Sequence, residues 1–131
     1  MSKYGRSNGE WDQLMDAGLK FLIEQARLQK TTSYTELDAV LRRRTGLRGF
    51  DFDLDSERAA MGHLLGLIVD QNEPTAHLMI SALVIYLNEN DAGPGFYSYA
   101  QQLGYLAPNA SKSQKEQFWV QQVSAAHAHY R

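Results

Sequence analysis

Three aspartates alternate with apolar residues in the segment 51–55, which reads Asp-Phe-Asp-Leu-Asp. In an extended segment alternate side chains face the same way, and carboxylate oxygens are the ligands that hard divalent cations prefer. The segment departs from the calcium-loop template, because Ser56 stands where that loop needs glycine and Gly62 where it needs a bidentate glutamate. Two interpretations follow: a solvated loop whose last acids cap a helix, or a metal site formed by Asp51, Asp53 and Asp55.

Four arginines lie close together just before this segment. Planar guanidinium groups suit phosphate oxygens, and at a helix end such a cluster can contact a nucleic-acid backbone. The same arginines can instead pair with the nearby aspartates. The net charge of −2 provides no general field that would attract nucleic acid, so any such contact must be local. The candidate nucleic-acid contacts are Tyr34, Arg42, Arg43, Arg44 and Arg48.

The segment 93–96, Gly-Pro-Gly-Phe, stands directly before an aromatic-rich helical pattern. Glycine permits positive φ and proline fixes φ near about −65°, a combination that suits a tight turn leading into a helix. Such a helix start presents the N–H groups of Gly95, Phe96 and Tyr97, which form a physically sound anion site. Phosphate-binding loops add a lysine or a longer glycine pattern, and neither is present. The sequence favours a structural turn, with anion binding as the alternative.

No segment of the chain matches a known catalytic motif. The absence of cysteine excludes thiol nucleophiles, thiolate metal sites and disulfides. Ser81 lacks the Gly-x-Ser-x-Gly elbow of a nucleophilic serine, and His127 and His129 are too close in sequence to chelate a metal from one helix face. We therefore assign no catalytic residue and expect no cofactor. The sequence leaves open whether Ser81, His63 and His77 share a pocket.

Apolar spacing and capping residues predict the helices that must position these groups. The first helix covers about 10–30, where apolar residues recur at three- and four-residue steps. Ser33 begins the second helix through a capping box with Glu36, and Gly46 ends it. Arginines in the last turn of this helix complement its dipole.

A third helix and one strand are predicted in the middle of the chain. Asp55 or Ser56 caps the third helix, and the segment 71–74, Gln-Asn-Glu-Pro, ends it. The segment 77–87 is nearly continuous in apolar residues and rich in branched ones. This pattern predicts a strand covered on both faces, or two short strands that meet at Ser81.

The remaining elements complete the expected fold. A short helix is predicted over 96–103 before Gly104, and a last helix from Ser111 or Ser113 to the C-terminus. The predicted class is α+β and mostly helical, with about five helices around a small β-sheet and a winged-helix-like arrangement as one option. Residues 1–8 are expected to form a flexible N-terminus, and residues 9–131 a single globular domain.

Composition and length are those of an ordinary globular protein. The chain has 131 residues, of which 44% are hydrophobic and 21% charged, which fits one domain with a substantial core. The N-terminus lacks a hydrophobic signal core, and the longest apolar run is about half the roughly 20 residues that a membrane helix needs. We therefore expect a cytoplasmic protein with no membrane partner.

The second half of the chain resembles a family of small, functionally uncharacterised proteins of bacteria and their phages. The resemblance covers about residues 55–130 and implies a compact domain, but no reaction. It is carried by His-Leu-Leu-Gly at 63–66, Ile-Ser-Ala-Leu-Val-Ile at 80–85, Gly-Pro-Gly-Phe at 93–96, Tyr-Ala-Gln-Gln-Leu-Gly at 99–104 and a final helix with Phe118 and Trp119.

The first half is similar to the winged-helix half of alkylguanine-DNA alkyltransferases and their non-catalytic relatives. The similarity lies in the order helix, Thr-Thr-Ser-Tyr-Thr-Glu-Leu at 31–37, helix and strand, with Tyr34 matching and Thr35 replacing a glycine. The Pro-Cys-His-Arg active-site stretch of that family is missing, and Thr-Ala-His-Leu at 75–78 stands near its place. The resemblance implies a shape suited to DNA binding. The missing active-site cysteine excludes alkyl transfer.

These observations leave three functional hypotheses in order of preference. The first is a non-catalytic module of a bacterium or phage that binds another macromolecule, a protein partner or double-stranded DNA, with a homodimer as a further option. The second is a DNA-binding winged helix that uses the arginine cluster. The third is a small metal- or ligand-dependent enzyme that uses Asp51, Asp53 and His63 beside the Gly-Pro-Gly turn.

Overall fold

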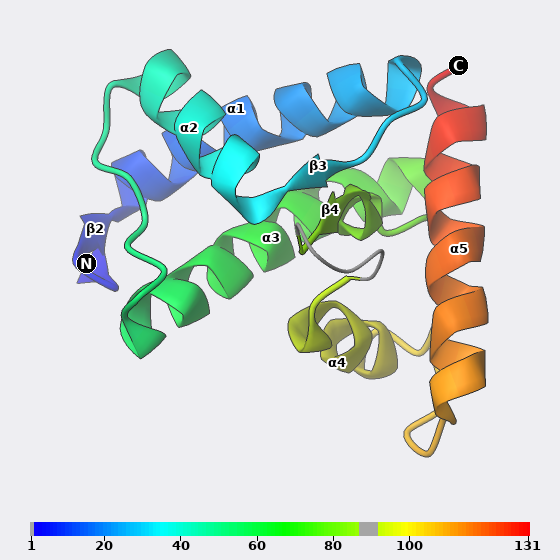
Figure 1. Cartoon of the computed structure of the whole chain (residues 1–131). Helices are drawn as coiled ribbons and strands as arrows, with labels where there is room; N and C mark the ends of the chain where they lie inside the picture. Colours follow the sequence, from blue (N-terminus) through cyan, green and yellow to red (C-terminus); the bar gives the residue numbers. More distant parts are fainter. Residues whose placement is uncertain (1, 87–91) are drawn as a thin grey trace.

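The computed structural model describes residues 2–86 and 92–131 (Figure 1). Most of this part of the chain lies in the helices α1 (Asn8–Arg27), α2 (Tyr34–Thr45), α3 (Asp55–Ala76), α4 (Pro94–Gln102) and α5 (Lys112–His129). The other elements are short: β1 (Ser2–Lys3), β2 (Arg6–Ser7), β3 (Thr32–Ser33), the 3-10 helix η1 (Ile80–Leu83) and β4 (Val84–Ile85). The predicted class, a mostly helical α+β fold with about five helices and a small sheet, is confirmed.

Side-chain caps fix where three of the helices begin. Ser7 and Glu10 form a capping box at α1, and Ser111 forms another with Gln114 at α5. At α2 the Ser33 hydroxyl accepts a hydrogen bond from the Glu36 N–H, as predicted. The Glu36 carboxylate accepts from the Thr32 hydroxyl instead of closing the box. The predicted stop at Gly46 is also confirmed, because this residue has a φ of 71° in the left-handed region.

The third helix differs from its prediction at both ends. Leu54 is its N-cap residue and makes no side-chain capping bond, so neither Asp55 nor Ser56 caps it. The helix also continues through Pro74 to Ala76. A proline this close to the end removes a single backbone hydrogen bond, and the apolar packing of α3 in the main core, which includes Leu64, Ile68 and Ala76, offsets that loss.

The predicted strand at 77–87 is wrong over most of its described length. His77 ends α3, η1 follows as a turn of 3-10 helix, and only Val84–Ile85 is a strand. Residues 78–84 are buried, as expected, but η1 packs against α1, α3 and α5. Helices on these sides offer no strand edge, so the backbone of this segment forms local hydrogen bonds in a 3-10 helix. An apolar sequence alone does not distinguish a buried strand from such a buried helical turn. Residue 87 lies outside the described residues.

The two small sheets differ in direction. β1 pairs with β2 antiparallel, and β3 pairs with β4 parallel, with Thr32 opposite Val84 and Ser33 opposite Ile85. A wing is an antiparallel hairpin next to the recognition helix, so the described part of the chain contains no wing beside α2. The parallel pair instead ties the start of α2 to the segment that leads toward α4.

The N-terminal segment, whose flexibility stays a prediction, contacts the rest of the protein. Residues 2–7 form a hairpin that turns at Tyr4 and Gly5, both with positive φ, as a two-residue hairpin turn requires. The Trp11 indole N–H donates to the Lys3 carbonyl at 3.0 Å, and Arg6 is 1% exposed. The hairpin is therefore packed on the start of α1 and α3.

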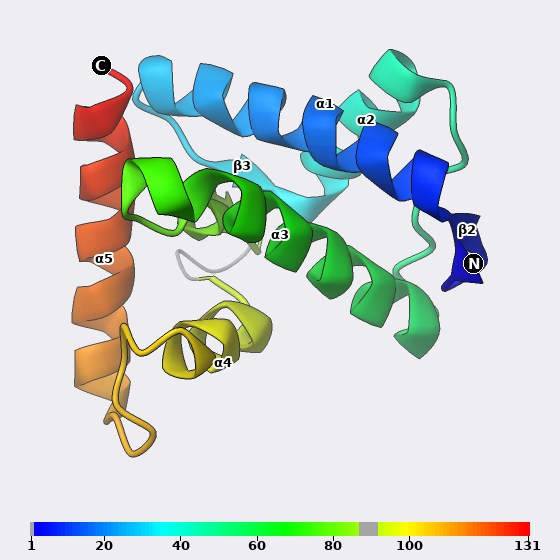
Figure 2. The same ribbon diagram turned by 180° about the vertical axis from the view of Figure 1, so that it is seen from behind.

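Two hydrophobic cores organise the helices. The main core lies among α1, α2, α3 and η1, and includes Leu14, Leu22, Leu37, Leu64 and Ile68. The small core joins α4 to α5 and η1 through Met79, Phe96, Tyr97, Ala100 and Phe118. In both views α5 stands beside the ends of α1 and α3, and α4 lies on the far side of α3 from α1 (Figures 1 and 2). None of the helices in the described ranges has the length and apolarity to cross a membrane.

Candidate functional site

The predicted nucleic-acid contacts are not gathered into one surface. Arg44 pairs with Glu24 of α1 at 2.8 Å, Arg48 with Glu57 of α3 at 3.1 Å, and Arg42 with Asp38 of its own helix at 3.5 Å. These acids differ from the aspartates of the 51–55 segment that the sequence suggested as partners. Tyr34, at the other end of α2, is packed against Tyr86 with ring centroids 5.2 Å apart. Arginine pairing within the protein therefore explains most of the cluster.

The three aspartates do not form a cation site. Asp51 accepts a hydrogen bond from the Asp53 backbone N–H at 3.1 Å, and Asp55 pairs with Arg58. All three are exposed. In residues 2–86 and 92–131, no three histidine, aspartate or glutamate side chains are arranged to hold a metal. The alternation 51–55 fails as a site because the segment turns instead of extending.

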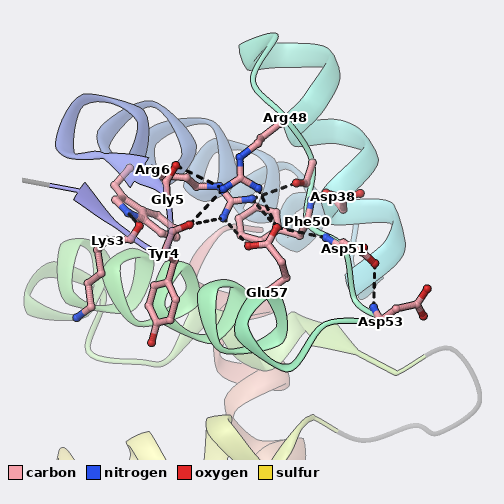
Figure 3. Close-up of polar contacts among 12 residues, drawn as sticks. Lys3, Tyr4, Gly5, Arg6, Asp38, Arg48, Phe50, Asp51, Asp53 and Glu57 are labelled. Atoms are coloured by element: carbon pink, nitrogen blue, oxygen red, sulfur yellow. Dashed lines mark hydrogen bonds and ion pairs between the residues drawn. The ribbon is translucent and has the colours of Figure 1, made fainter.

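A buried ion pair that the sequence did not reveal lies beside these aspartates (Figure 3). The Arg6 guanidinium donates to both carboxylate oxygens of Glu57 at 2.9 and 3.0 Å and to the Gly49 carbonyl at 3.0 Å. It also lies 4.1 Å from the Phe50 ring centroid. Arg6 first, and then Arg48, hold the pKa of the Glu57 carboxyl below its ordinary value. The pair joins the N-terminal hairpin to the start of α3. Because the two charged groups are already hydrogen-bonded to each other, we assign the pair a structural role.

The Gly-Pro-Gly segment forms the start of α4, with Gly93 as the N-cap residue and in close contact with two tyrosines. A Cβ on Gly93 would lie 2.8 Å from the Tyr34 hydroxyl oxygen and 3.1 Å from that of Tyr86. Burial raises the pKa of Tyr34 to about 12. Pro94 occupies the first turn of α4, and the Phe96 N–H donates to the Gly93 carbonyl at 3.1 Å. The Phe96 N–H of the predicted anion site is therefore already bonded within the helix start, whereas anion binding at Gly95 and Tyr97 stays a prediction.

A groove runs between α3 and α4 on either side of this turn. It consists of two cavities of about 430 and 340 Å³ that share Tyr34, Gly62 and Gly95. We call it the α3–α4 groove. Its larger cavity lies along Gly66 and Asp70 of α3 and includes Phe96, Ser98 and Tyr99 of α4. Its smaller cavity lies along Arg58 of α3 and includes Phe52, Tyr86 and Pro94.

Glycines leave the floor of the groove open. At Gly62 and Gly66 of α3, and at Gly95 of α4, an added Cβ would meet no other atom within 4 Å. A glycine inside a helix lowers its stability by about 1 kcal/mol relative to alanine. The two glycines of α3 thus expose helix backbone to the groove. They lower the stability of the helix, although the surrounding packing leaves room for a side chain at both positions.

The groove answers whether Ser81, His63 and His77 share a pocket. Ser81 and His63 both line the larger cavity, together with Asp70, and His77 does not. The His63 ring packs edge-on against Trp11 at 4.7 Å between centroids, and burial, followed by the charge of Lys3, lowers its pKa. No hydrogen bond joins His63 to Ser81 or Asp70 in the described residues. The three groups therefore form no nucleophile–base pair in this geometry.

Asp70 is instead bonded to α4. It accepts the hydroxyl hydrogen bond of Tyr99, and this bond, with burial, raises the pKa of Tyr99 to about 12. One turn further along α3, Glu73 accepts the Tyr105 hydroxyl at 2.6 Å. Two tyrosine–carboxylate bonds thus fix the distance between α3 and the segment that contains α4 at this end of the groove.

Ser81 is held rigidly in the wall of the larger cavity. The Met79 N–H donates to the Gln122 side chain of α5 at 2.7 Å, and the Trp119 indole donates to the Ala82 carbonyl at 2.9 Å. Ser81 itself is 5% exposed, and its hydroxyl has no hydrogen-bond partner among the described residues. In this part of the chain, only Asn72 Oδ1 is a sealed side-chain atom without a partner, so the Ser81 hydroxyl remains accessible from the cavity.

Comparison with known proteins adds no further evidence: no family model, curated protein or solved structure matches the chain. The resemblances to the bacterial and phage family and to the alkyltransferase winged helix therefore stay predictions. The functional conclusion depends on the groove itself.

Proposed function

We propose that this protein is a non-catalytic interaction module that binds a segment of a partner protein in the α3–α4 groove. The observation that supports this most directly is the glycine floor. Gly62 and Gly66 lie one helical turn apart on α3 and face open space in a groove with aromatic side chains along it. Small residues at this spacing let another backbone approach a helix closely.

The dimensions of the groove suit a peptide segment. The residues of α3 that line it extend from Arg58 to Asp70, which corresponds to roughly 18 Å along the helix axis. The two cavities lie end to end over this length and share three residues. A compact small molecule fills a single pocket, whereas a segment of about 12 residues in a helix would span both cavities.

The charges at the two ends of the groove define an orientation for the occupant. At the Pro94 end the N-terminus of α4 adds positive character, whereas Arg58 there is already paired with Asp55. Asp70 lies at the opposite end. A complementary segment has an acidic group near the N-terminus of α4, a basic group near Asp70, and apolar or aromatic residues between them.

The same features favour a protein partner over DNA. A phosphate backbone would meet the carboxylate of Asp70, and three of the four predicted arginines already pair with acids of this chain. Binding also accounts for the site better than catalysis does, because His63, Ser81 and Asp70 are not hydrogen-bonded to one another in the described residues.

Selection from a library of random peptides of about 12 residues displayed on phage tests the proposal. We expect peptides selected on the wild-type protein to bind Gly62→Leu at least about tenfold more weakly, because the new side chain fills the floor that both cavities share. Gly62→Leu should nevertheless be as thermally stable as the wild type or more so, because leucine favours the helix.

Gly9→Leu is the matched control, because Gly9 is an exposed glycine in the first turn of α1, far from the groove along the chain. It should bind the selected peptides as the wild type does. Peptides that bind Gly62→Leu and the wild type equally well would refute the α3–α4 groove as the binding site.

A further inference from the structure

We propose that the larger cavity of the α3–α4 groove receives a phenolic side chain, that of a tyrosine, whose hydroxyl exchanges a hydrogen bond with Ser81. This inference rests on the proposed function, since it names the residue type that the partner segment places in the groove. It depends on the contacts of Ser81 and on the rings around the cavity.

Ser81 supplies the polar half of the recognition. Its hydroxyl lies in a residue that is 95% buried, is accessible from the cavity and has no partner in the described residues. A ligand that displaces water from this hydroxyl without bonding to it leaves it unpaired, so a ligand that offers a hydrogen bond there is preferred over one that does not. The hydrogen bonds that Met79 and Ala82 make with α5 fix the backbone of η1 on either side of Ser81.

Aromatic residues supply the apolar half. Tyr34, Phe96 and Tyr99 line the same cavity, and the open positions at Gly62 and Gly66 leave room for a flat ring to lie against α3. Aromatic pairs in offset or edge-on arrangements are more favourable than burial alone. A ring with a polar tip therefore fits this cavity better than an aliphatic alcohol or an unsubstituted ring.

The proposed occupant is an unmodified tyrosine, whose phenol is neutral at the pH of a cell, and not a negatively charged group. Asp70, at the rim, carries a negative charge that would repel a phosphotyrosine or a carboxylate. The Tyr99 hydroxyl already donates to one oxygen of Asp70 at the rim. Ser81, which is buried in the wall and has no partner in the described residues, is the group that we expect to distinguish tyrosine from phenylalanine.

The test compares N-acetyl-tyrosinamide with N-acetyl-phenylalaninamide as probes, followed by 1H–15N NMR titration of the wild-type protein. We expect the tyrosine amide to shift the backbone resonances of Ser81, Gly66 and Phe96 and to bind about tenfold more tightly than the phenylalanine amide. In Ser81→Ala this preference should disappear. Ser98→Ala is the matched control, because Ser98 is an exposed serine on the same cavity, and it should keep the preference.

The outcomes separate the two proposals. Equal affinities of the two amides for the wild type, or a preference that survives in Ser81→Ala, would overturn the tyrosine subsite while the peptide selection still decides on the groove. A tyrosine preference that depends on Ser81, combined with peptides insensitive to Gly62→Leu, would support the subsite and refute the partner segment. If neither amide shifts the groove resonances, the subsite is wrong. The Ser81→Ala protein is expected to fold, because the change removes only a hydroxyl without a partner.

Discussion

At Gly93 the backbone passes so close to two tyrosine hydroxyl groups that a side chain there would force them to shift. Its φ of −72° is available to any residue, so the requirement for glycine is steric and not conformational. Gly95, two residues later, faces open space. The two glycines of one short motif therefore have different roles, and the structure predicts different results when each is replaced.

Gly93→Ala should lower the free energy of unfolding by about 1–3 kcal/mol, because the added methyl group collides with the Tyr34 hydroxyl. Gly95→Ala should leave stability unchanged or raise it by up to about 1 kcal/mol, because alanine favours the helix. Urea denaturation of both variants measures the difference. The loss at Gly93 should shrink in a Tyr34→Phe background; a loss of the same size there would assign it to another contact.

Individual site residues were predictable only where local sequence determines them. The turn role of the Gly-Pro-Gly segment follows from the backbone preferences of its residues. The pair Arg6–Glu57 joins residues 51 positions apart, and no local pattern reports such a contact. Ser81 is an isolated polar residue in an apolar run. That its hydroxyl has no hydrogen-bond partner in the described residues follows only from the structure, in which η1 packs against α5.

At the scale of the elements, α3 shows two departures from ordinary helix composition. It contains the groove glycines near its middle and Pro74 near its end, and both lower helix stability. Tertiary packing of its buried side, including Leu64 and Ile68, outweighs these local preferences. Local signals predict a stop at 71–74, because they do not include that packing.

Pro74→Ala should raise the free energy of unfolding by about 1 kcal/mol or more, because it restores a backbone N–H that can donate to the Asp70 carbonyl. Thermal denaturation followed by circular dichroism measures the change. The neighbouring exposed substitution Thr75→Ala serves as a control and should alter stability by less than about 0.5 kcal/mol. A less stable Pro74→Ala would mean that the restriction of the unfolded chain by proline dominates.

The segment 77–87 shows why the type of an element was harder to predict than its burial. Continuous apolar character correctly predicted that residues 78–84 lie inside the protein. Its partners decide its conformation, and these are three helices and one two-residue strand. The five helices, by contrast, have amphipathic spacing or capping residues within their own sequence, and each was predicted within a few residues of its described bounds.

At the scale of the whole molecule, carboxylates with lowered pKa values link stability to pH. Hydrogen bonds from Ser7 at Glu10, Arg44 at Glu24 and Arg6 at Glu57 lower the folded-state pKa of each. A carboxyl group whose folded pKa is depressed stabilises the protein fully above its unfolded pKa. That contribution is lost as the pH falls through the folded pKa. The protein should therefore lose stability below roughly pH 4.

Glu57→Gln should lower the free energy of unfolding near neutral pH by about 3 kcal/mol, because Arg6 then remains buried beside a neutral group. It should also flatten the pH dependence at acid pH, which urea denaturation over a pH series measures. Glu24→Gln removes an exposed pair and should cost less than about 1 kcal/mol. Unchanged acid sensitivity in Glu57→Gln would place the linkage in other carboxylates.

The α3–α4 groove is lined from both hydrophobic clusters, because Leu65 and Leu67 of α3 pack against the main core and Phe96 of α4 lies in the small one. A segment bound in the groove would contact both clusters and link them. Binding would therefore stabilise the tertiary structure as a whole: α4 would open to solvent less often, and the two hydrophobic cores would unfold in a single transition.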